Sequence, residues 1–339
     1  MMKVLVCGCG SIGTRHIGIM RQHFDVDLLA YDPDPERVAG VQQCFDVAAT
    51  SDSALAFASH PELVMVCGPT STHLATARRA LSCGAHLFIE KPISHTPDGV
   101  AELLDEAERA QRFVGVGSNM RFATGPATLR QHLHRIEPIH YSRAAVGYYL
   151  PYMRRGVDYR SLYAAQRKQG GGVLLDDIHE IDYHVWLFGE VAQVSCQTAN
   201  RGDLEMDAED YAHLSLCFTS GMVSQIDMDY LNRCRTRNCE IIGQGGTLVW
   251  EERGKPSHCT IRLYTDRSSD WQTIHQSDEA HSDACYVAQL RELFAVLAGK
   301  PKMVLADGRE GLCALRLAFR ARESAADRQR TRCCRFDMH

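Results

Sequence analysis

Six titratable side chains crowd into one short apolar segment, GGGVLLDDIHEIDYHVWLFG at Gly170–Gly189. They are Asp176, Asp177, His179, Glu180, Asp182 and His184. The apolar residues between them predict a mostly buried helix, in which unpaired charges would cost roughly several kcal/mol. In one helix, Asp176 and Asp182 would each lie a turn from His179. Either carboxylate could then hold the imidazole in one tautomer, as general acid/base catalysis requires. For His184 we expect a structural role.

A lysine at the end of an apolar run is the second candidate, in the segment LFIEKPIS at Leu87–Ser94. The run predicts a buried strand, and Glu90 and Lys91 would stand where that strand ends. Open α/β sheets bind their ligands at the carboxyl ends of their strands. Lys91 is therefore a candidate site residue, and a surface ion pair with Glu90 is the simpler alternative.

The segment GCGSIG places Gly8, Gly10 and Gly13 between a predicted strand and a predicted helix. Glycines at this spacing allow a tight bend, close approach of a pyrophosphate, and close helix packing. Asp32 follows about 20 residues later, where a carboxylate accepts hydrogen bonds from the adenosine ribose and disfavours a 2′-phosphate. This pattern predicts NAD rather than NADP. Asp32 could instead be a turn residue of DPDPE, and the nearby Arg37 leaves some NADP use open.

The composition is that of an ordinary globular protein. Of the 339 residues, 45% are hydrophobic and 23% charged, which is enough for a large core and predicts two domains. The net charge of -5 argues against a nucleic-acid partner. We expect no membrane span, because no apolar run approaches about 20 residues. A strand-like segment directly after Met2 leaves no room for a signal peptide, so we expect a cytoplasmic protein. The 14 cysteines lack C-x-x-C pairs, so we expect neither a metal site nor disulfides.

The elements that must position these residues change character along the chain. Five short runs rich in Val, Leu and Ile alternate with helical patterns before Ser118. They are Lys3–Gly8, Val26–Tyr31, Leu63–Gly68, His86–Lys91 and Phe113–Ser118, and Cys44–Thr50 could add a sixth. Such alternation predicts a doubly wound parallel sheet. After Ser118, several runs alternate with period two, which predicts a largely antiparallel sheet with one buried face. The predicted domains are 1–118 and 119–339.

Four motifs occur in a fixed order: GCGSIGTRH, GPTSTH, IEKP and GGGVLLDDIHEID. In this order and spacing the chain resembles the Gfo/Idh/MocA family of nicotinamide-dependent oxidoreductases over nearly its whole length. The resemblance implies a Rossmann domain joined to an α/β domain with a large, mainly antiparallel, open-faced sheet. It also implies a carbohydrate or cyclitol substrate and a homodimer or homotetramer formed through that sheet.

The resemblance implies roles for the two candidate groups. Lys91 would hydrogen-bond the reacting oxygen and stabilise alkoxide charge while hydride leaves for the nicotinamide. His179 would take the hydroxyl proton, or return it during reduction. The orienting carboxylate would be Asp176, with Asp177 and Asp182 as rivals, because the spacing here is D-x-x-H rather than the commoner D-x-x-x-H. This shorter form resembles family members of bacterial surface-sugar biosynthesis.

Cofactor and substrate contacts also follow from the resemblance. The matching cofactor positions are Gly8, Gly10, Ser11, Ile12, Gly13, Asp32, Pro69, Thr70, His73, Glu90 and Lys91. Asn119 and Arg121 lie where the family turns toward its substrate. The later segment rich in tyrosine and arginine offers Tyr149, Arg154 and Arg155, whose ring and guanidinium groups suit an anionic carbohydrate such as a nucleotide sugar or sugar acid. A polar loop that covers an oligomer interface is the alternative.

Two other classes of function stay open at this stage. An NAD-dependent, redox-neutral glycosidase of the same fold would carry nearly identical residues. A non-catalytic dinucleotide sensor would also bind NAD, but it gives no reason to keep both Lys91 and a buried His179. The sequence does not decide the exact substrate, the direction of reaction, or the oligomeric state.

Overall fold

The computed structural model describes residues 1–154, 156–202, 204–254, 257–268, 270–278 and 283–328. These residues form two compact units, each assembled from separate stretches of sequence. Unit 1 consists of described residues within 1–127, 167–170 and 281–315, and unit 2 of those within 128–166, 171–280 and 316–339. The sequence boundary predicted after Ser118 stays a prediction. None of the helices in the described ranges combines the length and apolarity needed to cross a lipid bilayer.

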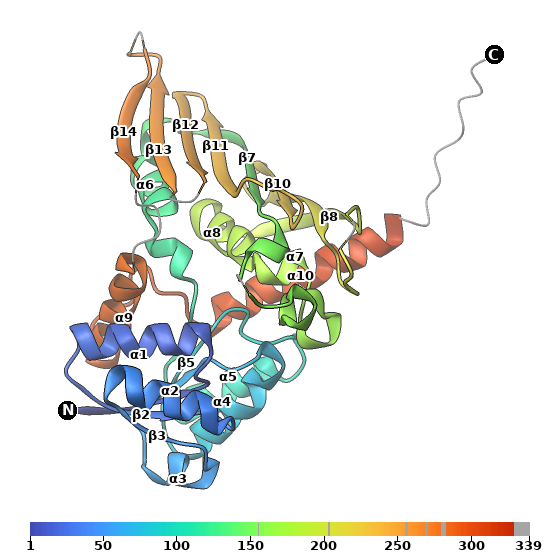
Figure 1. Ribbon diagram of the computed structural model, residues 1–339. Coiled ribbons are helices and arrows are strands. Elements are labelled where there is room, and N and C mark those ends of the chain that lie inside the picture. The colour runs from blue at the N-terminus through green and yellow to red at the C-terminus, as the bar shows by residue number, and fades with distance from the viewer. Residues whose placement is uncertain (155, 203, 255–256, 269, 279–282, 329–339) are drawn as a thin grey trace. The chain divides into compact units, whose positions relative to one another are not determined.

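Unit 1 contains a six-stranded parallel sheet with the order β3-β2-β1-β4-β5-β6, which confirms the doubly wound fold (Figure 1). Its strands are β1 (Met2–Cys7), β2 (Val26–Tyr31), β3 (Ala48–Thr50), β4 (Leu63–Val66), β5 (His86–Ile89) and β6 (Val114–Val116). Its helices are α1 (Ser11–His23), α2 (Pro35–Phe45), α3 (Ser53–Ala58), α4 (His73–Ser82), α5 (Val100–Arg109) and α9 (Ala284–Leu297). Every residue of β4 and β6 is buried, as expected of strands covered on both faces.

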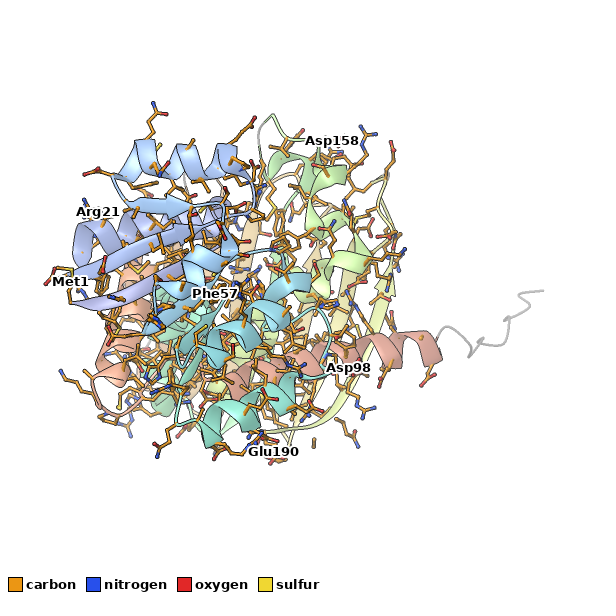
Figure 2. All side chains as sticks on the ribbon, turned by 90° about the horizontal axis from the view of Figure 1, so that it is seen from below. Met1, Arg21, Phe57, Asp98, Asp158 and Glu190 are labelled. Atoms are coloured by element: carbon orange, nitrogen blue, oxygen red, sulfur yellow. The ribbon has the colours of Figure 1, made fainter. Side chains whose placement is uncertain are left out.

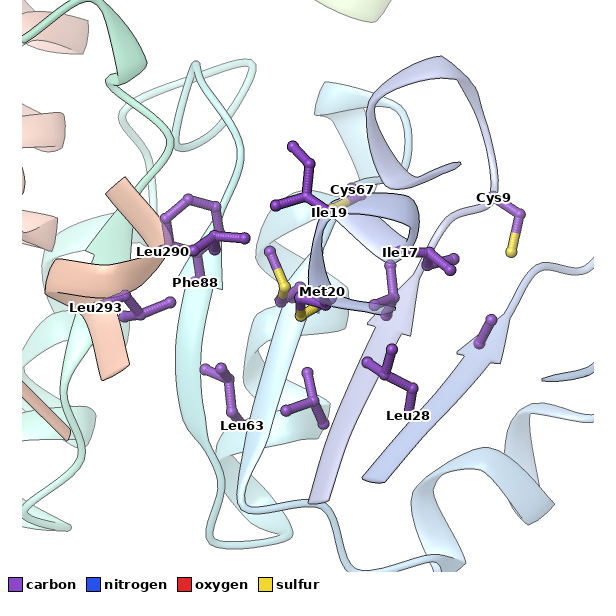
Figure 3. Packing of buried hydrophobic residues seen from close by; sticks show 14 of the residues in the cluster. Cys9, Ile17, Ile19, Met20, Leu28, Leu63, Cys67, Phe88, Leu290 and Leu293 are labelled. Carbon is purple, nitrogen blue, oxygen red and sulfur yellow. The ribbon is translucent and has the colours of Figure 1, made fainter. Parts of the chain in front are cut away.

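The core of unit 1 joins residues from distant parts of the chain. Leu63 and Phe88 on the parallel strands belong to one buried cluster with Leu290 and Leu293 of α9 (Figure 3). Beside this cluster, the Val116 N–H donates to the Ala306 carbonyl at 2.9 Å, so the edge of β6 is also paired with late residues. The N-terminal sheet is therefore completed by a segment that follows most of unit 2 in sequence.

Unit 2 contains an eight-stranded sheet with the order β14-β13-β12-β11-β7-β10-β9-β8 (Figure 1). Its strands are β7 (Ile139–Gly147), β8 (Val191–Ala199), β9 (Tyr211–Phe218), β10 (Val223–Asp229), β11 (Thr236–Gly243), β12 (Gly246–Arg253), β13 (His258–Thr265) and β14 (Gln272–Ser277). All neighbours are antiparallel except β7 and β10, which run parallel. The predicted, mainly antiparallel sheet is confirmed.

Helices cover one face of this second sheet. Side chains of β9 to β13 alternate between buried and partly exposed, as a sheet with one covered face requires. On the buried face, Tyr183 of α8 (Ile178–Phe188) packs edge-on against Trp250 of β12, with ring centroids 6.3 Å apart. Phe188 packs against Phe218 of β9 in the same way, at 5.6 Å. The helix that carries His179 is thus fixed on the sheet by aromatic contacts.

Candidate functional site

The turn between β1 and α1 needs glycine at two of its three predicted positions for steric reasons. Gly8 has a φ of 107°, and a Cβ there would lie 2.6 Å from the Gly68 nitrogen. A Cβ on Gly13 would lie 1.8 Å from the Gly8 carbonyl oxygen. At Gly10 a Cβ would meet only an Arg37 nitrogen, at 3.7 Å. Gly8 and Gly13 therefore build the turn, whereas Gly10 leaves its outer side open to a ligand.

Helix α1 presents its N-terminus at this open turn. Ser11, Ile12 and Gly13 form its first turn, and no side chain caps the helix at Gly10. The backbone N–H groups and the helix dipole of such an end favour an anion. The turn therefore fits the pyrophosphate of a dinucleotide, which Ser11, Ile12 and Gly13 would hold through their backbone.

Asp32 at the end of β2 is buried and fixed by the same turn. Its Oδ2 accepts from the Cys9 N–H at 2.7 Å and its Oδ1 from the Asp34 N–H at 2.9 Å. The half-exposed guanidinium of Arg37 lies 3.7 Å from Oδ2. The carboxylate thus has one orientation, as a contact to ribose hydroxyls requires. Arg37 stands beside it and weakens the repulsion that Asp32 would exert on a 2′-phosphate.

The cysteines beneath this turn behave as core residues. Burial, and then the Cys9 charge, raises the pKa of the Cys7 thiol to about 12. Burial, and then Asp32, raises the pKa of Cys9 to about 12 as well. Cys67 at the end of β4 is fully buried, and its pKa is also raised. These thiols stay protonated at neutral pH and are not nucleophiles.

His73 braces two loops instead of exposing its ring. Its Nδ1 lies 2.9 Å from the Pro92 carbonyl oxygen and its Nε2 3.0 Å from the Gly68 carbonyl oxygen. Burial lowers its pKa. Of the neighbouring predicted cofactor residues, Pro69 is exposed and Thr70 is buried. His73 therefore fixes the turns after β4 and β5 through their backbones, and its predicted contact with the cofactor stays a prediction.

Glu90 contacts His16, a residue for which no role was predicted. Glu90 is buried, and its Oε1 lies 2.7 Å from the Nε2 of the fully buried His16. Its Oε2 accepts from the Lys91 backbone N–H at 3.2 Å. A Cβ at Gly117 would lie 2.7 Å from the Glu90 carboxyl group, so glycine there makes room for it. The only signal for His16 was its place in GTRH, on the helix that follows the glycine turn.

Lys91 itself lies half-buried directly after β5, at the carboxyl end of the parallel sheet. This is the position expected of a ligand-contacting residue in an open α/β sheet. Together with the glycine turn and Asp32, it places the predicted cofactor groups of unit 1 at one edge of the sheet.

Arg121 lies buried in unit 1 and forms an ion pair. It is 2% exposed, and its Nη1 donates to Glu310 Oε1 at 2.7 Å. Burial alone would raise the pKa of Glu310, but Arg121 and Lys302 lower it to about 2. Asn119 donates to the Cys285 sulfur at 3.6 Å. Arg121 thus takes part in a buried ion pair of unit 1, and substrate binding by Asn119 and Arg121 stays a prediction.

In unit 2 the predicted single helix is interrupted. It forms α7 (Val173–Asp176) and α8, with the break at Asp177, whose φ and ψ are -94° and 32°. Asp176 and His179 are therefore not successive turns of one continuous helix, contrary to our expectation. Asp182, by contrast, follows His179 by one turn within α8.

Asp176 collects three tyrosine hydroxyl groups. Its Oδ2 accepts from Tyr148 at 2.9 Å and from Tyr230 at 3.1 Å, and its Oδ1 accepts from Tyr163. Burial, and next the charge of Asp176, raises the pKa of each tyrosine well above its usual value. The hydroxyls therefore stay protonated and donate. Asp176 ties residues near the ends of β7 and β10 to the short helix α7.

The two carboxylates on either side of His179 share one guanidinium. Arg237 of β11 donates to Asp177 Oδ1 at 2.9 Å, and its Nε lies 2.9 Å from Glu180 Oε1. The Tyr183 hydroxyl donates to Glu180 Oε2 at 2.6 Å. Burial raises the pKa of Glu180 to about 7, against the lowering effect of Arg237 and Tyr183. Arg237 had no predicted role, because it lies 60 residues from Asp177 in sequence.

The two histidines of α8 differ in burial. His179 is half-buried. His184 is fully buried, its Nδ1 lies 2.6 Å from the Glu180 carbonyl oxygen, and burial lowers its pKa to about 4. A histidine that stays neutral in the core has a structural role, so His179 is the better candidate for proton transfer.

The tyrosine- and arginine-rich segment forms an aromatic surface in unit 2. The Arg233 guanidinium lies 3.5 Å from the centroid of the Tyr149 ring, and Tyr152 packs edge-on against that ring at 4.8 Å. Tyr152 and Arg154 are exposed. Arg155 lies outside the described residues.

Further along this segment, an ion-pair group explains another of its arginines. Arg160 pairs with Asp158, which is labelled in Figure 2, at 2.9 Å and with Glu205 at 3.1 Å. Such exposed pairs contribute little to stability, but they occupy the guanidinium. Arg154 and Arg233 are therefore the better candidates for an anion contact in this part of unit 2.

Comparison with known families covers most of the chain. Residues 2–118 match the model of an oxidoreductase family with an NAD-binding Rossmann fold, GFO_IDH_MocA. Residues 149–332 match the model for the C-terminal α/β domain of the same oxidoreductase family.

Individual relatives agree with these matches. The myo-inositol 2-dehydrogenase of Thermotoga maritima is 24% identical over an alignment of 355 positions. This alignment covers 97% of this chain and 97% of the relative. An oxidoreductase from Agrobacterium radiobacter was crystallised with NAD+, L-tartaric acid and magnesium. Its structure matches this one with a TM-score of 0.82 at 19% identity, and the match covers 96% of each chain. The WlbA dehydrogenase from Bordetella pertussis, crystallised with NADH and UDP-GlcNAcA, has a TM-score of 0.80 at 20% identity, with 96% of this chain and 97% of that one covered. The two crystal structures have the same fold as this chain.

Proposed function

Because this chain belongs to the Gfo/Idh/MocA family of NAD-binding oxidoreductases, we propose that it transfers hydride between NAD and a hydroxyl-bearing or keto carbon of a carbohydrate or cyclitol. The observation that carries this proposal is the position of Lys91 at the carboxyl end of β5, in the same sheet as the glycine turn and Asp32. The substrate classes follow from the relatives, whose names include inositol dehydrogenases and a dehydrogenase crystallised with a nucleotide sugar acid.

Lys91 supplies positive charge to the reacting oxygen. When bound, the nicotinamide accepts the hydride in oxidation and donates it in reduction. The Lys91 ammonium hydrogen-bonds the oxygen on the same carbon and stabilises the alkoxide charge that develops there. Glu90, fixed by His16, accepts from the backbone N–H of Lys91 and so orients the start of its loop.

His179 moves the hydroxyl proton. As a general base it takes this proton during oxidation, and as a general acid it returns it during reduction. Asp176 already accepts from three tyrosines, and Asp177 already binds Arg237. Asp182 lies one turn after His179 in α8, so it competes with Asp176 for the role of orienting the imidazole. A larger loss of kcat in Asp182→Asn than in Asp176→Asn would assign that role to Asp182.

The aromatic surface favours an anionic substrate within this class. Tyr149 offers a ring that stacks on a sugar or base, and Arg154 offers a guanidinium for carboxylate or phosphate, as predicted. Arg233, stacked on Tyr149, adds a second cation. We expect Arg154→Gln and Arg233→Gln each to raise the KM for an anionic sugar while leaving the KM for NAD unchanged. An unchanged substrate KM in both variants would remove the anion from the proposal.

The decisive experiment incubates the protein with NAD and a panel of free sugars, inositols, sugar acids, nucleotide sugars and aryl glycosides. Reduced nicotinamide absorbance and aglycone release are recorded together. We expect NADH to accumulate with one class of substrate, and kcat to fall about 10²–10³-fold in Lys91→Ala. The exposed Lys300→Ala is the matched control and should keep full activity.

Other outcomes would assign the chain to a different class of function. Aglycone release without net NADH would show a redox-neutral glycosidase. NAD binding without turnover of any substrate would favour the dinucleotide sensor and contradict hydride transfer.

Assembly and location complete the proposal. The strands of unit 2 keep many partly exposed side chains on alternate positions, which supports a homodimer or homotetramer formed through this sheet. Light scattering coupled to gel filtration would measure the assembly, and a monomer at micromolar concentration would contradict it. A cytoplasmic location stays a prediction.

A further inference from the structure

Arg237 is a charged residue at a buried position of the second sheet, where a charge is costly unless it is paired. It stands near the start of β11, in register with Val146 of β7 and with Glu252 of β12, and it is only 6% exposed. Glu252 is directly opposite on the neighbouring strand and also buried, so the two side chains share one face of the sheet. This is the face on which α8 packs.

The guanidinium reaches two carboxylates that stand on either side of His179 in sequence. The contact to Asp177, the residue just before α8, is 2.9 Å, and the contact to Glu180 in the first turn of α8 is also 2.9 Å. Two points fixed one turn apart determine the rotation of a helix about its axis. They therefore also determine the direction in which His179 leaves the helix.

Stability alone does not explain this arrangement. Replacing a buried ion pair by apolar residues of similar volume is often neutral or stabilising, so such a pair is weak evidence for a stabilising role. Aromatic contacts of Tyr183 and Phe188 already fix α8 on the sheet. What arginine adds is one side chain that approaches two carboxylates at once, with a hydrogen bond to Asp177 and an ion pair to Glu180.

We propose that Arg237 is a positioning residue for His179, which holds the first turn of α8 in one rotation by binding Asp177 and Glu180 together. This inference rests on the proposed acid/base role of His179. The groups that act on Glu180 are the charges of Arg237 of β11, Asp177 before α8 and Glu252 of β12, and the hydrogen bond from the Tyr183 hydroxyl. Because Glu180 has a pKa of about 7, its charge changes in the range where a histidine also titrates.

Two variants separate positioning from folding. Arg237→Lys keeps the charge but loses the guanidinium, and Glu180→Gln removes one charge while keeping an acceptor for Tyr183. Arg253→Lys, at an arginine of β12 whose side chain is 67% exposed, is the matched control. We expect Arg237→Lys to bind NAD within about twofold of the parent, and to lose about 10- to 100-fold in kcat. Glu180→Gln should shift the pH profile of kcat, and Arg253→Lys should change neither quantity.

The result that overturns the proposal is specific. If Arg237→Lys lowers the melting temperature but keeps kcat and the pH profile of the parent, Arg237 is only structural. If Arg237→Lys does not fold, an unchanged pH profile of kcat in Glu180→Gln would likewise show that Arg237 is only structural.

A measurement without turnover keeps this inference distinct from the proposed function. The titration of His179 is followed by NMR with ¹³C-labelled histidine, and His179→Asn assigns its signal. Loss of the Glu180 charge in Glu180→Gln should lower the His179 pKa, whereas loss of the guanidinium in Arg237→Met should raise it. Equal His179 titration in all variants would refute the coupling. Full activity of His179→Asn would instead refute the proposed role of His179, whatever the titration shows.

Discussion

The glycine turn of unit 1 and the carboxylate cluster of unit 2 are built in different ways. At the turn, backbone groups set the geometry: Gly13 lies against the Gly8 carbonyl, Gly8 lies against the Gly68 nitrogen, and the Cys9 N–H donates to Asp32. In the cluster, Asp176 and Asp177 take their partners from strands that are remote in sequence. The glycine turn is thus a backbone-built site, which depends on the absence of side chains. The carboxylate cluster is a side-chain-built site, which depends on the partners that its side chains find.

The largest expected effect tests the backbone-built turn. In Gly13→Ala the new Cβ would lie 1.8 Å from the Gly8 carbonyl oxygen, so the turn must open. We expect NAD affinity to fall roughly 100-fold or more, about 2.7 kcal/mol, in a titration followed by intrinsic fluorescence. Gly40→Ala is the control, because no atom beyond the neighbouring helix backbone lies within 4 Å of that Cβ and alanine favours a helix. Unchanged NAD affinity in Gly13→Ala would contradict the backbone-built description.

The next effect concerns the one side chain on which the turn depends. Asp32→Ala removes the acceptor for the Cys9 N–H and the predicted contact to ribose. We expect a loss of about 1.5–3 kcal/mol in NAD binding and a smaller preference for NAD over NADP, because Arg37 remains nearby. Asp34→Ala, which removes the cap of α2, should lower the melting temperature slightly and leave the NAD dissociation constant unchanged. Equal NAD affinity of parent and Asp32→Ala would remove Asp32 from the cofactor site.

A smaller effect is expected in the side-chain-built cluster. Tyr163→Phe removes one of the three donors to Asp176 and leaves a buried carboxylate less satisfied. We expect the free energy of unfolding in urea to fall by about 1–2 kcal/mol. The control Tyr264→Phe changes a 36% exposed tyrosine and should have almost no effect. If the two variants were equally stable, the tyrosine donors would not hold the cluster together.

The smallest effect shows that unit 1 also contains a side-chain-built network. Glu310 has a pKa lowered to about 2, below its ordinary value of 4.5, so its stabilising effect is complete above about pH 4.5 and is lost as the pH falls toward 2. We expect Glu310→Gln to cost about 0.5–1 kcal/mol at pH 7 and much less near pH 2, because Glu310 is partly exposed. Urea unfolding at pH 7, 4 and 2 measures this, with the exposed Glu323→Gln as control. A cost independent of pH would exclude the ion pair as its source.

The same contrast explains how much could be predicted from sequence. Each strand of the parallel sheet, the glycine turn and the place of Lys91 followed from residues close together in the chain. His16 escaped assignment because its partner Glu90 is 74 residues away, and Arg237 because Asp177 is 60 residues away. Such pairs form only once sheet order brings strands together. The helix break at Asp177 was missed for the same reason, since the donors to Asp176 and Asp177 come from other elements.

The late segment that completes the first sheet has a consequence for synthesis on the ribosome. Leu290 and Leu293 enter the core of the N-terminal strands, and the Ala306 carbonyl pairs with the edge at Val116. At about 5–20 residues per second, translation of residues 119–306 takes roughly 10–40 s. During this time the edge of β6 can pair with other chains. The parallel sheet therefore leaves the ribosome before unit 2, and yet it stays unfinished until residue 306 has been added.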